Sequence, residues 1–112
     1  MEARAEARYV RTSAQKARLV IDLIRGKNVT EALMTLKFTN KRATREIEKV
    51  VNSAVANATQ KSENVNVDDL FIETAFINEG PRLKRIRPAP MGRAYRYQRR
   101  TSHITIQLGE KE

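Results

Sequence analysis

The chain contains no cysteine and no tryptophan, and its one histidine is His103. Without cysteine it can form no disulfide framework, no thiolate nucleophile and no cysteine-ligated zinc site. One histidine cannot supply a pair of imidazole ligands, so we expect no metal site. No apolar run approaches the ~20 residues that a membrane-spanning helix needs, and no apolar stretch follows Met1–Arg4. We therefore expect no signal peptide and no membrane partner.

Aromatic residues are also scarce, at 5% of the 112 residues, against 40% apolar and 31% charged residues. A chain of this length forms one domain and buries roughly 65% of its unfolded surface, so a small core is feasible. Acidic residues are outnumbered, because 22 Lys and Arg oppose 13 Asp and Glu to give a net charge of +9. This balance predicts an intracellular protein with a polyanionic partner, nucleic acid before membrane.

The excess positive charge is confined to about one fifth of the chain. Residues 1–78 carry 13 basic and 10 acidic side chains, whereas residues 79–100 carry 8 basic side chains and one acidic side chain. The segment 79–100 also contains all three prolines and two of the four glycines. We therefore divide the single domain 1–112 into a globular part, 1–78 with 101–112, and an extended arm, 79–100.

Three helices are predicted in the globular part. A capping box over Thr12–Gln15 and the apolar spacing that follows it predict a helix over 14–25, with Gly26 directly after its end. Asn28 opens a second, shorter helix, and Asn40 precedes the longest one. The longest helix carries one apolar stripe of small and β-branched side chains, which suits packing on a sheet: Ala43, Ile47, Val50, Val51, Ala54, Val55 and Ala58.

Two segments predict strands directly, and a third is ambiguous. Leu70–Asn78 is rich in β-branched and aromatic residues, and 101–108 alternates isoleucine or leucine with polar side chains. Ala3–Val10 has a helix-favouring composition, but alanine and then Tyr9 alternate strictly with polar residues. We favour a strand there, because two strands alone make a weak sheet.

The composition of the arm admits three interpretations: a disordered loop, a solvated charged face, or a long β-hairpin with its tip near Pro88–Gly92. Hairpin arms of about ten residues would continue the flanking strands and project roughly 30 Å beyond the domain. A two-stranded ribbon is marginal by itself, and repulsion between its charges weakens it further. An ordered arm therefore requires a surrounding polyanion.

Arginine outnumbers lysine seven to one in the arm. A guanidinium group binds phosphate through two parallel hydrogen bonds and stacks on bases, whereas an ammonium group is a point charge. Tyr95 and Tyr97 interleave with these arginines and offer faces for base stacking, although packing across the hairpin explains the pair equally well. The arm thus favours nucleic-acid binding, with RNA ahead of DNA.

No group of residues forms a catalytic constellation, so we expect no enzyme. His103 is expected to be structural or a polar neighbour of RNA, because no acid or nucleophile is placed to help it act as a general base. The alternative class is a DNA regulator, since helix 14–25, the Gly26 turn and the next helix resemble a helix-turn-helix. The second helix, however, offers no base-reading arginine or glutamine. A small ribonuclease is disfavoured because an acid–base pair is lacking.

Eight short blocks, covering nearly the whole chain, are specific in their combined order and spacing: Arg11–Val20, Asp22–Lys27, Thr39–Lys41, Ser53–Ala58, Asn78–Pro81, Leu83–Arg85, Gly92–Ala94 and Arg100–Thr105. Together they resemble the bacterial form of the large-subunit ribosomal protein L twenty-two family. The resemblance implies an α+β fold, with three helices packed on a small three-stranded antiparallel sheet and a long protruding basic β-hairpin. It also implies a structural rRNA-binding protein of the large ribosomal subunit, without enzymatic activity or cofactor.

The resemblance places such a protein in the cytoplasm, within the ribosome. Its globular part would lie near the mouth of the peptide exit tunnel, and its arm would thread through rRNA and line the tunnel wall. It would act in early large-subunit assembly. The implied partners are several domains of the large rRNA, neighbouring large-subunit ribosomal proteins and the nascent peptide at the hairpin tip. No membrane contact and no homo-oligomer are implied.

Carried over position by position, the resemblance implies rRNA contacts at residues of both parts of the chain: Arg11, Ser13, Lys16, Arg18, Asn40, Lys41, Arg82, Lys84, Arg85, Arg87, Arg93, Arg96, Arg99, Arg100, Ser102 and His103. The tip that would form part of the tunnel wall comprises Pro88, Ala89, Pro90, Met91, Gly92 and Arg93. Relatives often carry basic residues at the positions of Ala89 and Met91, and two prolines at this tip would stiffen the turn instead.

Overall fold

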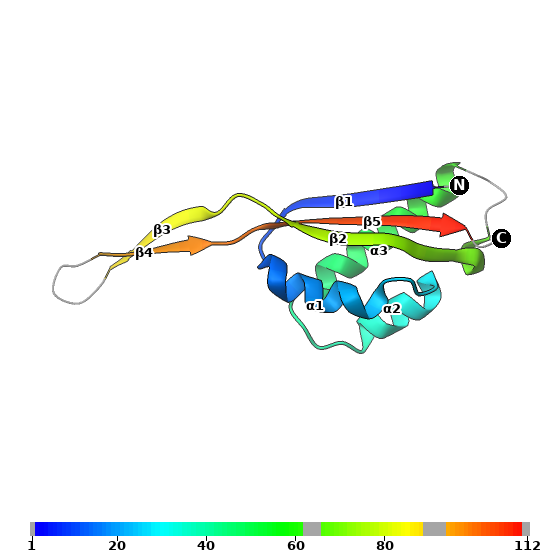
Figure 1. Cartoon of the computed structure of the whole chain (residues 1–112), viewed down its shortest axis with the longest axis horizontal. Coiled ribbons are helices and arrows are strands. Elements are labelled where there is room, and N and C mark those ends of the chain that lie inside the picture. Colours follow the sequence, from blue (N-terminus) through cyan, green and yellow to red (C-terminus); the bar gives the residue numbers. More distant parts are fainter. Residues whose placement is uncertain (1, 62–65, 89–93, 111–112) are drawn as a thin grey trace.

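The structure is a computed structural model that describes residues 2–61, 66–88 and 94–110, with the backbone alone in the two strands of the arm. The elements follow in this order: β1 (Glu2–Val10), α1 (Ala14–Ile24), α2 (Val29–Lys37), α3 (Thr44–Lys61), a 3-10 turn η1 (Val67–Asp69), β2 (Leu70–Glu79), β3 (Leu83–Pro88), β4 (Ala94–Arg99) and β5 (Ser102–Glu110). The helices cover one face of a sheet, and β3 and β4 extend away from both (Figure 1). The fold is α+β, which confirms the expected class.

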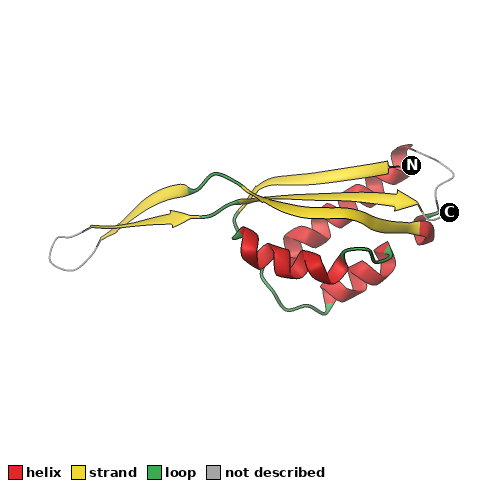
Figure 2. Ribbon diagram, viewed as in Figure 1, coloured by secondary structure: helices red, strands yellow, loops and turns green. Residues whose placement is uncertain are grey.

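The main sheet has the strand order β1-β5-β2, and both pairings are antiparallel. β5 lies in the centre, and most of its residues are buried. Its residues Ile104, Ile106 and Leu108 are buried, as the alternation in 101–108 predicts. The ambiguous segment Ala3–Val10 is a strand, as we favoured, and its Ala3 and Ala5 are buried against the helices. The sheet and its helical cover are distinguished by colour in Figure 2.

The predicted helix over 14–25 is confirmed to within one residue at its end. Its N-cap is Ser13, whose Oγ accepts from the Lys16 N–H at 3.3 Å, one residue after the threonine that begins the capping-box pattern. Gly26 follows the C-cap with a φ of 80°, a left-handed conformation that glycine adopts without a steric penalty. The Gly26 N–H then donates to the Ile72 carbonyl at 3.0 Å, which joins the end of α1 to β2.

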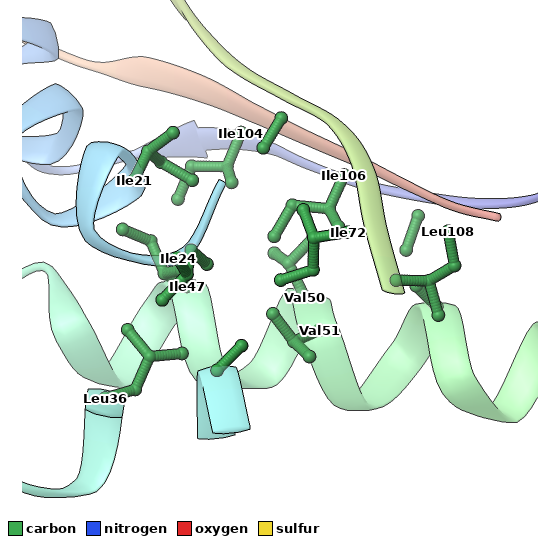
Figure 3. Packing of buried hydrophobic residues seen from close by; sticks show 14 of the residues in the cluster. Ile21, Ile24, Leu36, Ile47, Val50, Val51, Ile72, Ile104, Ile106 and Leu108 are labelled. Carbon is green, nitrogen blue, oxygen red and sulfur yellow. The ribbon is translucent and has the colours of Figure 1, made fainter. Parts of the chain in front are cut away.

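The core lies between the sheet and the three helices. Figure 3 shows Ile21 and Ile24 from α1, Leu36 from α2 and Ile47 from α3 directed toward the isoleucines of β5. α3 packs on β1 and β5, which confirms the predicted helix-on-sheet contact. All members of the apolar stripe are buried except Val55, which packs partly buried at the margin of the core. The helix begins four residues after Asn40.

The strict alternation expected in β1 breaks at Tyr9. The pairing register between β1 and β5 shifts between Ala7 and Val10, which marks a β-bulge. Tyr9 lies in this bulge with a φ of 59° and is 62% exposed, whereas alternation with Ala3 and Ala5 would have directed its side chain toward the core. A bulge adds one residue to a strand, and the alternation of residues in the sequence does not predict where this occurs.

The arm is a hairpin over the described part of its length, as the third interpretation predicts. β3 and β4 form a two-stranded antiparallel ribbon, with a register that runs from Leu83 opposite Arg99 to Pro88 opposite Ala94. Figure 1 shows β2 and β5 leading into this ribbon, and the molecule measures 65 × 26 × 15 Å along its principal axes. The tip at 89–93 lies outside the described residues.

The root of the arm is held by hydrogen bonds between its two crossing strands. The Gly80 N–H donates to the Thr101 carbonyl at 2.9 Å, and the Thr101 Oγ1 donates to the Pro81 carbonyl at 2.6 Å. A Cβ on Gly80 would lie 2.5 Å from Thr101 Oγ1, so a side chain at this position would force the strands apart. None of the helices in the described ranges combines the length and apolarity needed to cross a membrane.

Candidate nucleic-acid interface

A hollow of about 660 Å³, which we call the basic hollow, lies between the start of α1 and the segment that leads into α3. Two segments distant in sequence meet there, together with Arg100, which directly follows β4. The lining residues are Arg11, Thr12, Ser13, Lys16, Leu19, Asn40, Lys41, Arg42, Ala43 and Arg100. Five of them are cations and none is a carboxylate, so the hollow concentrates positive charge.

The five cations of the basic hollow have no anionic partner within the described part of the chain. None of them forms an ion pair or a side-chain hydrogen bond there. α1 and α3 also begin at the hollow, directly after Ser13 and Ala43, so the positive ends of two helix dipoles add to the potential. A cluster of unpaired cations in a concave site attracts a polyanion.

The structure brings together six of the residues for which the resemblance to the family implies rRNA contacts. They come from three separate parts of the chain and all line the basic hollow: Arg11, Ser13, Lys16, Asn40, Lys41 and Arg100. In particular, the basic motif before α1 and the Asn40–Lys41 motif form one surface rather than two. Their direct contact with rRNA stays a prediction.

Three other predicted contacts have partners inside the protein. The Arg18 Nη2 donates to the Ile77 carbonyl of β2 at 3.0 Å. Ser102 is buried, and its Oγ donates to the Thr12 carbonyl at 2.7 Å. The His103 Nδ1 accepts from the Tyr9 N–H at 3.1 Å, which agrees with the structural role expected for this histidine. Contact of these side chains with rRNA also stays a prediction.

Sequence reasoning did not select Arg42, which lines the basic hollow and is exposed. A signal was present, because Arg42 directly follows Lys41 and extends the same short basic run. The block of family-like residues that begins at Thr39 ends at Lys41. The sequence also does not indicate that the helix starts four residues after Asn40. Only the folded chain shows that this turn faces Arg11.

The arm holds the remaining predicted contacts, among which Arg82 is exposed at its root. Lys84, Arg85 and Arg87 belong to β3, and Arg96 and Arg99 belong to β4. The register pairs Arg85 with Tyr97 and Arg87 with Tyr95. The two tyrosines therefore have basic residues as cross-strand neighbours, and both interpretations of the tyrosine pair remain open.

The predicted tip extends beyond the described residues. Of the predicted tip, Pro88 ends β3, whereas Ala89, Pro90, Met91, Gly92 and Arg93 lie outside the described residues. No group of three or more metal-ligating side chains gathers within 2–61, 66–88 and 94–110.

Comparison with known proteins places this geometry in context. The family model described as ribosomal protein L22p/L17e matches residues 5–109. Large ribosomal subunit protein uL22 of Solibacter usitatus is 63% identical over 112 residues, which cover 100% of this chain and 99% of that protein. The protein of the same name from Koribacter versatilis is 55% identical over 115 residues, covering 99% of this chain and 69% of the relative. That of Halothermothrix orenii is 54% identical over 112 residues, covering 100% and 98%.

Proposed function

The chain belongs to the ribosomal protein L22p/L17e family, and from this premise we propose how its two parts bind rRNA. The protein is a structural, non-enzymatic component of the large ribosomal subunit in the cytoplasm, with rRNA and other ribosomal proteins as partners. The basic hollow binds the phosphate backbone of the large rRNA. The arm threads between rRNA domains, and its tip forms part of the wall of the peptide exit tunnel, near the nascent peptide.

One observation carries the proposal for the globular part: five cations line one hollow, and none has a partner among the described residues. Holding like charges together costs free energy in the absence of an anion, and phosphate groups relieve this repulsion. Arg11, Arg42 and Arg100 also offer guanidinium groups, which bind phosphate through paired hydrogen bonds. Phosphate contacts of this kind position a protein on RNA without reading its sequence.

The proposal for the arm rests on its shape and charge together with the resemblance to the family. A molecule that is 65 Å long and 15 Å thin exposes more surface than a compact domain of the same length. Residues 79–100 carry 8 basic side chains and one acidic side chain. A narrow basic ribbon can enter spaces between RNA helices that a globular domain cannot. Because it would join separate rRNA domains, we propose that the protein acts early in subunit assembly.

A helix-turn-helix DNA reader fits the geometry less well. α2 buries Val29, Ala32 and Leu36 in the core, and its exposed residues include Glu31 and Met34. A recognition helix needs side chains that form hydrogen bonds with base edges in the major groove. A competition experiment between A-form RNA and duplex DNA at constant salt separates the two functions, and we expect RNA to compete more strongly.

The basic hollow is tested by the salt dependence of binding to a transcript of the large-subunit rRNA. Each phosphate contact contributes about 0.9 to the slope of log K against log salt concentration. We therefore expect Arg11→Ala and Arg42→Ala each to lower the magnitude of the slope by about one. Arg45→Ala is the matched control, because Arg45 is exposed on α3 but does not line the hollow. Unchanged slopes for both Arg11 and Arg42 variants would exclude the hollow as a phosphate site.

A further inference from the structure

Tyr9 has a backbone conformation that its residue type disfavours. Among the described residues it is the only one other than glycine with a positive φ, at 59°. Glycine adopts this left-handed conformation freely and asparagine tolerates it, whereas the Cβ of a bulky residue crowds the backbone. Such strain persists where the surrounding structure enforces it, and it is frequent at binding sites. The tyrosine at this position therefore calls for a reason beyond local folding.

His103 of β5 holds Tyr9 in place. Its Nδ1 accepts from the Tyr9 N–H at 3.1 Å, and its ring meets the tyrosine ring edge to face, with centroids 5.0 Å apart and planes at 89°. The imidazole lies beside Gly80, where an added Cβ would approach its Cε1 to 3.2 Å. Two contacts with the His103 ring thus orient Tyr9, while 62% of the residue stays exposed.

The surroundings of Tyr9 are basic and continuous with the phosphate site. Tyr9 lines a second hollow of about 490 Å³ together with Arg8, Arg11, Arg42 and other residues. This hollow shares Arg11, Thr12, Arg42 and Ala43 with the basic hollow. Its only carboxylate, Glu46, lies 3.9 Å from the Lys49 Nζ, so that acidic charge has its own partner.

We propose that Tyr9 is a stacking platform for an unpaired nucleobase of the rRNA strand whose phosphates occupy the basic hollow. This inference rests on the function proposed above. Proteins recognise unpaired RNA by stacking bases on exposed aromatic rings beside cationic groups that bind the backbone. The hollow that Tyr9 lines is continuous with the basic hollow, so the ring lies where a base would follow from a strand whose phosphates bind those cations.

The test compares Tyr9→Asn with Tyr9→Phe in the full-length chain. Asparagine keeps the backbone N–H and tolerates the left-handed conformation but removes the ring, whereas phenylalanine keeps the ring. Thermal unfolding of each variant establishes that the fold is retained. We expect Tyr9→Asn to bind a large-subunit rRNA transcript at least about fivefold more weakly, and Tyr9→Phe to stay within about twofold of the unchanged protein.

The salt slope distinguishes the failure of this proposal from the failure of the proposed function. Loss of stacking removes no phosphate contact, so we expect the slope of Tyr9→Asn to equal that of the unchanged protein. Unaltered affinity of Tyr9→Asn would overturn the stacking proposal, even if Arg11→Ala and Arg42→Ala lower the slope. Equal weakening of Tyr9→Phe and Tyr9→Asn would assign the effect to a hydrogen bond of the hydroxyl rather than to the ring, and would also overturn it. If Tyr9→Asn binds rRNA normally but a neighbouring protein is lost from reconstituted subunits, Tyr9 contacts a protein instead, and the stacking proposal is overturned.

Discussion

The strands of the arm continue those of the globular part, yet the two regions are stabilised by different contacts. In the globular part, β5 pairs on both edges and is covered by helices, and its apolar side chains are fully buried. In the arm, β3 and β4 pair only with each other. Burial of apolar surface stabilises the first region without a partner, whereas an isolated ribbon is marginal in water. We therefore predict that the arm depends on rRNA for its order.

The basic side chains that the structure describes are of two kinds. Arg25 of the globular part donates from Nη2 and Nε to the Ala75 carbonyl at 2.8 and 3.2 Å, and from Nη1 to Asp22 at 2.7 Å. Together with Arg18 it joins α1 to the edge strand β2. The cations of the basic hollow have no such partners within the described residues. The first kind joins α1 to β2, and we propose that the second kind binds rRNA.

Deletion of the arm is expected to have the largest effect on rRNA binding and a small one on folding. Replacing 82–99 with an Asn-Gly turn removes seven basic residues and leaves every member of the described core cluster in place. We expect helical circular dichroism to be retained, and the salt slope for large-subunit rRNA to fall by up to about six. Incorporation into reconstituted subunits measures the role in assembly. An unfolded product would show that the division between the two parts is wrong.

Gly80→Ala probes the boundary between the two regions. The new Cβ would lie 2.5 Å from Thr101 Oγ1, which is itself hydrogen-bonded to the Pro81 carbonyl. We expect the free energy of unfolding in urea to fall by about 1–3 kcal/mol, the usual cost of overpacking. The double variant with Thr101→Ala removes the opposing atom and should lose less than the sum of the two single effects. Additive losses would exclude this contact as the cause.

Arg25→Ala and Lys84→Ala should separate the two kinds of cation. Arg25→Ala removes charge-assisted hydrogen bonds that are partly exposed, so we expect it to lower the free energy of unfolding by about 1 kcal/mol and to leave the salt slope unchanged. Lys84→Ala should lower the magnitude of the slope by about one and leave stability unchanged. Urea unfolding and rRNA titration are measured on both variants. A reduced salt slope for Arg25→Ala would contradict the distinction between cations that stabilise the fold and cations that bind rRNA.

Most of the fold could be predicted from local patterns. The spacing of apolar residues before Gly26 gives α1, and the seven-residue apolar stripe gives the helix that packs on the sheet. The Tyr9 bulge could not be predicted, because it depends on a register shift between β1 and β5 and on a contact with His103. Thr105 is a second example: it occupies a polar position in the alternation of β5 but is buried.

The candidate site was predictable only in part. Arg11 and Lys41 were selected from short motifs, but their convergence on one hollow is a property of the tertiary fold. The burial of Ser102 likewise depends on the Thr12 carbonyl, which is distant in sequence. In the arm, composition alone identified the excess charge but admitted three interpretations of the structure. The resemblance to the family favoured the hairpin, which the pairing of β3 with β4 confirms over the described part.

Amide hydrogen exchange along the chain tests the central claim, that rRNA holds the arm straight. In the free protein we expect the amides of β3 and β4 to exchange rapidly, while those of β5 are protected. In the assembled large subunit we expect both sets to be protected. Strong protection of β3 and β4 in the free protein would contradict the account, because the ribbon would then be stable without RNA. Rapid exchange of the same amides in the subunit would contradict it equally.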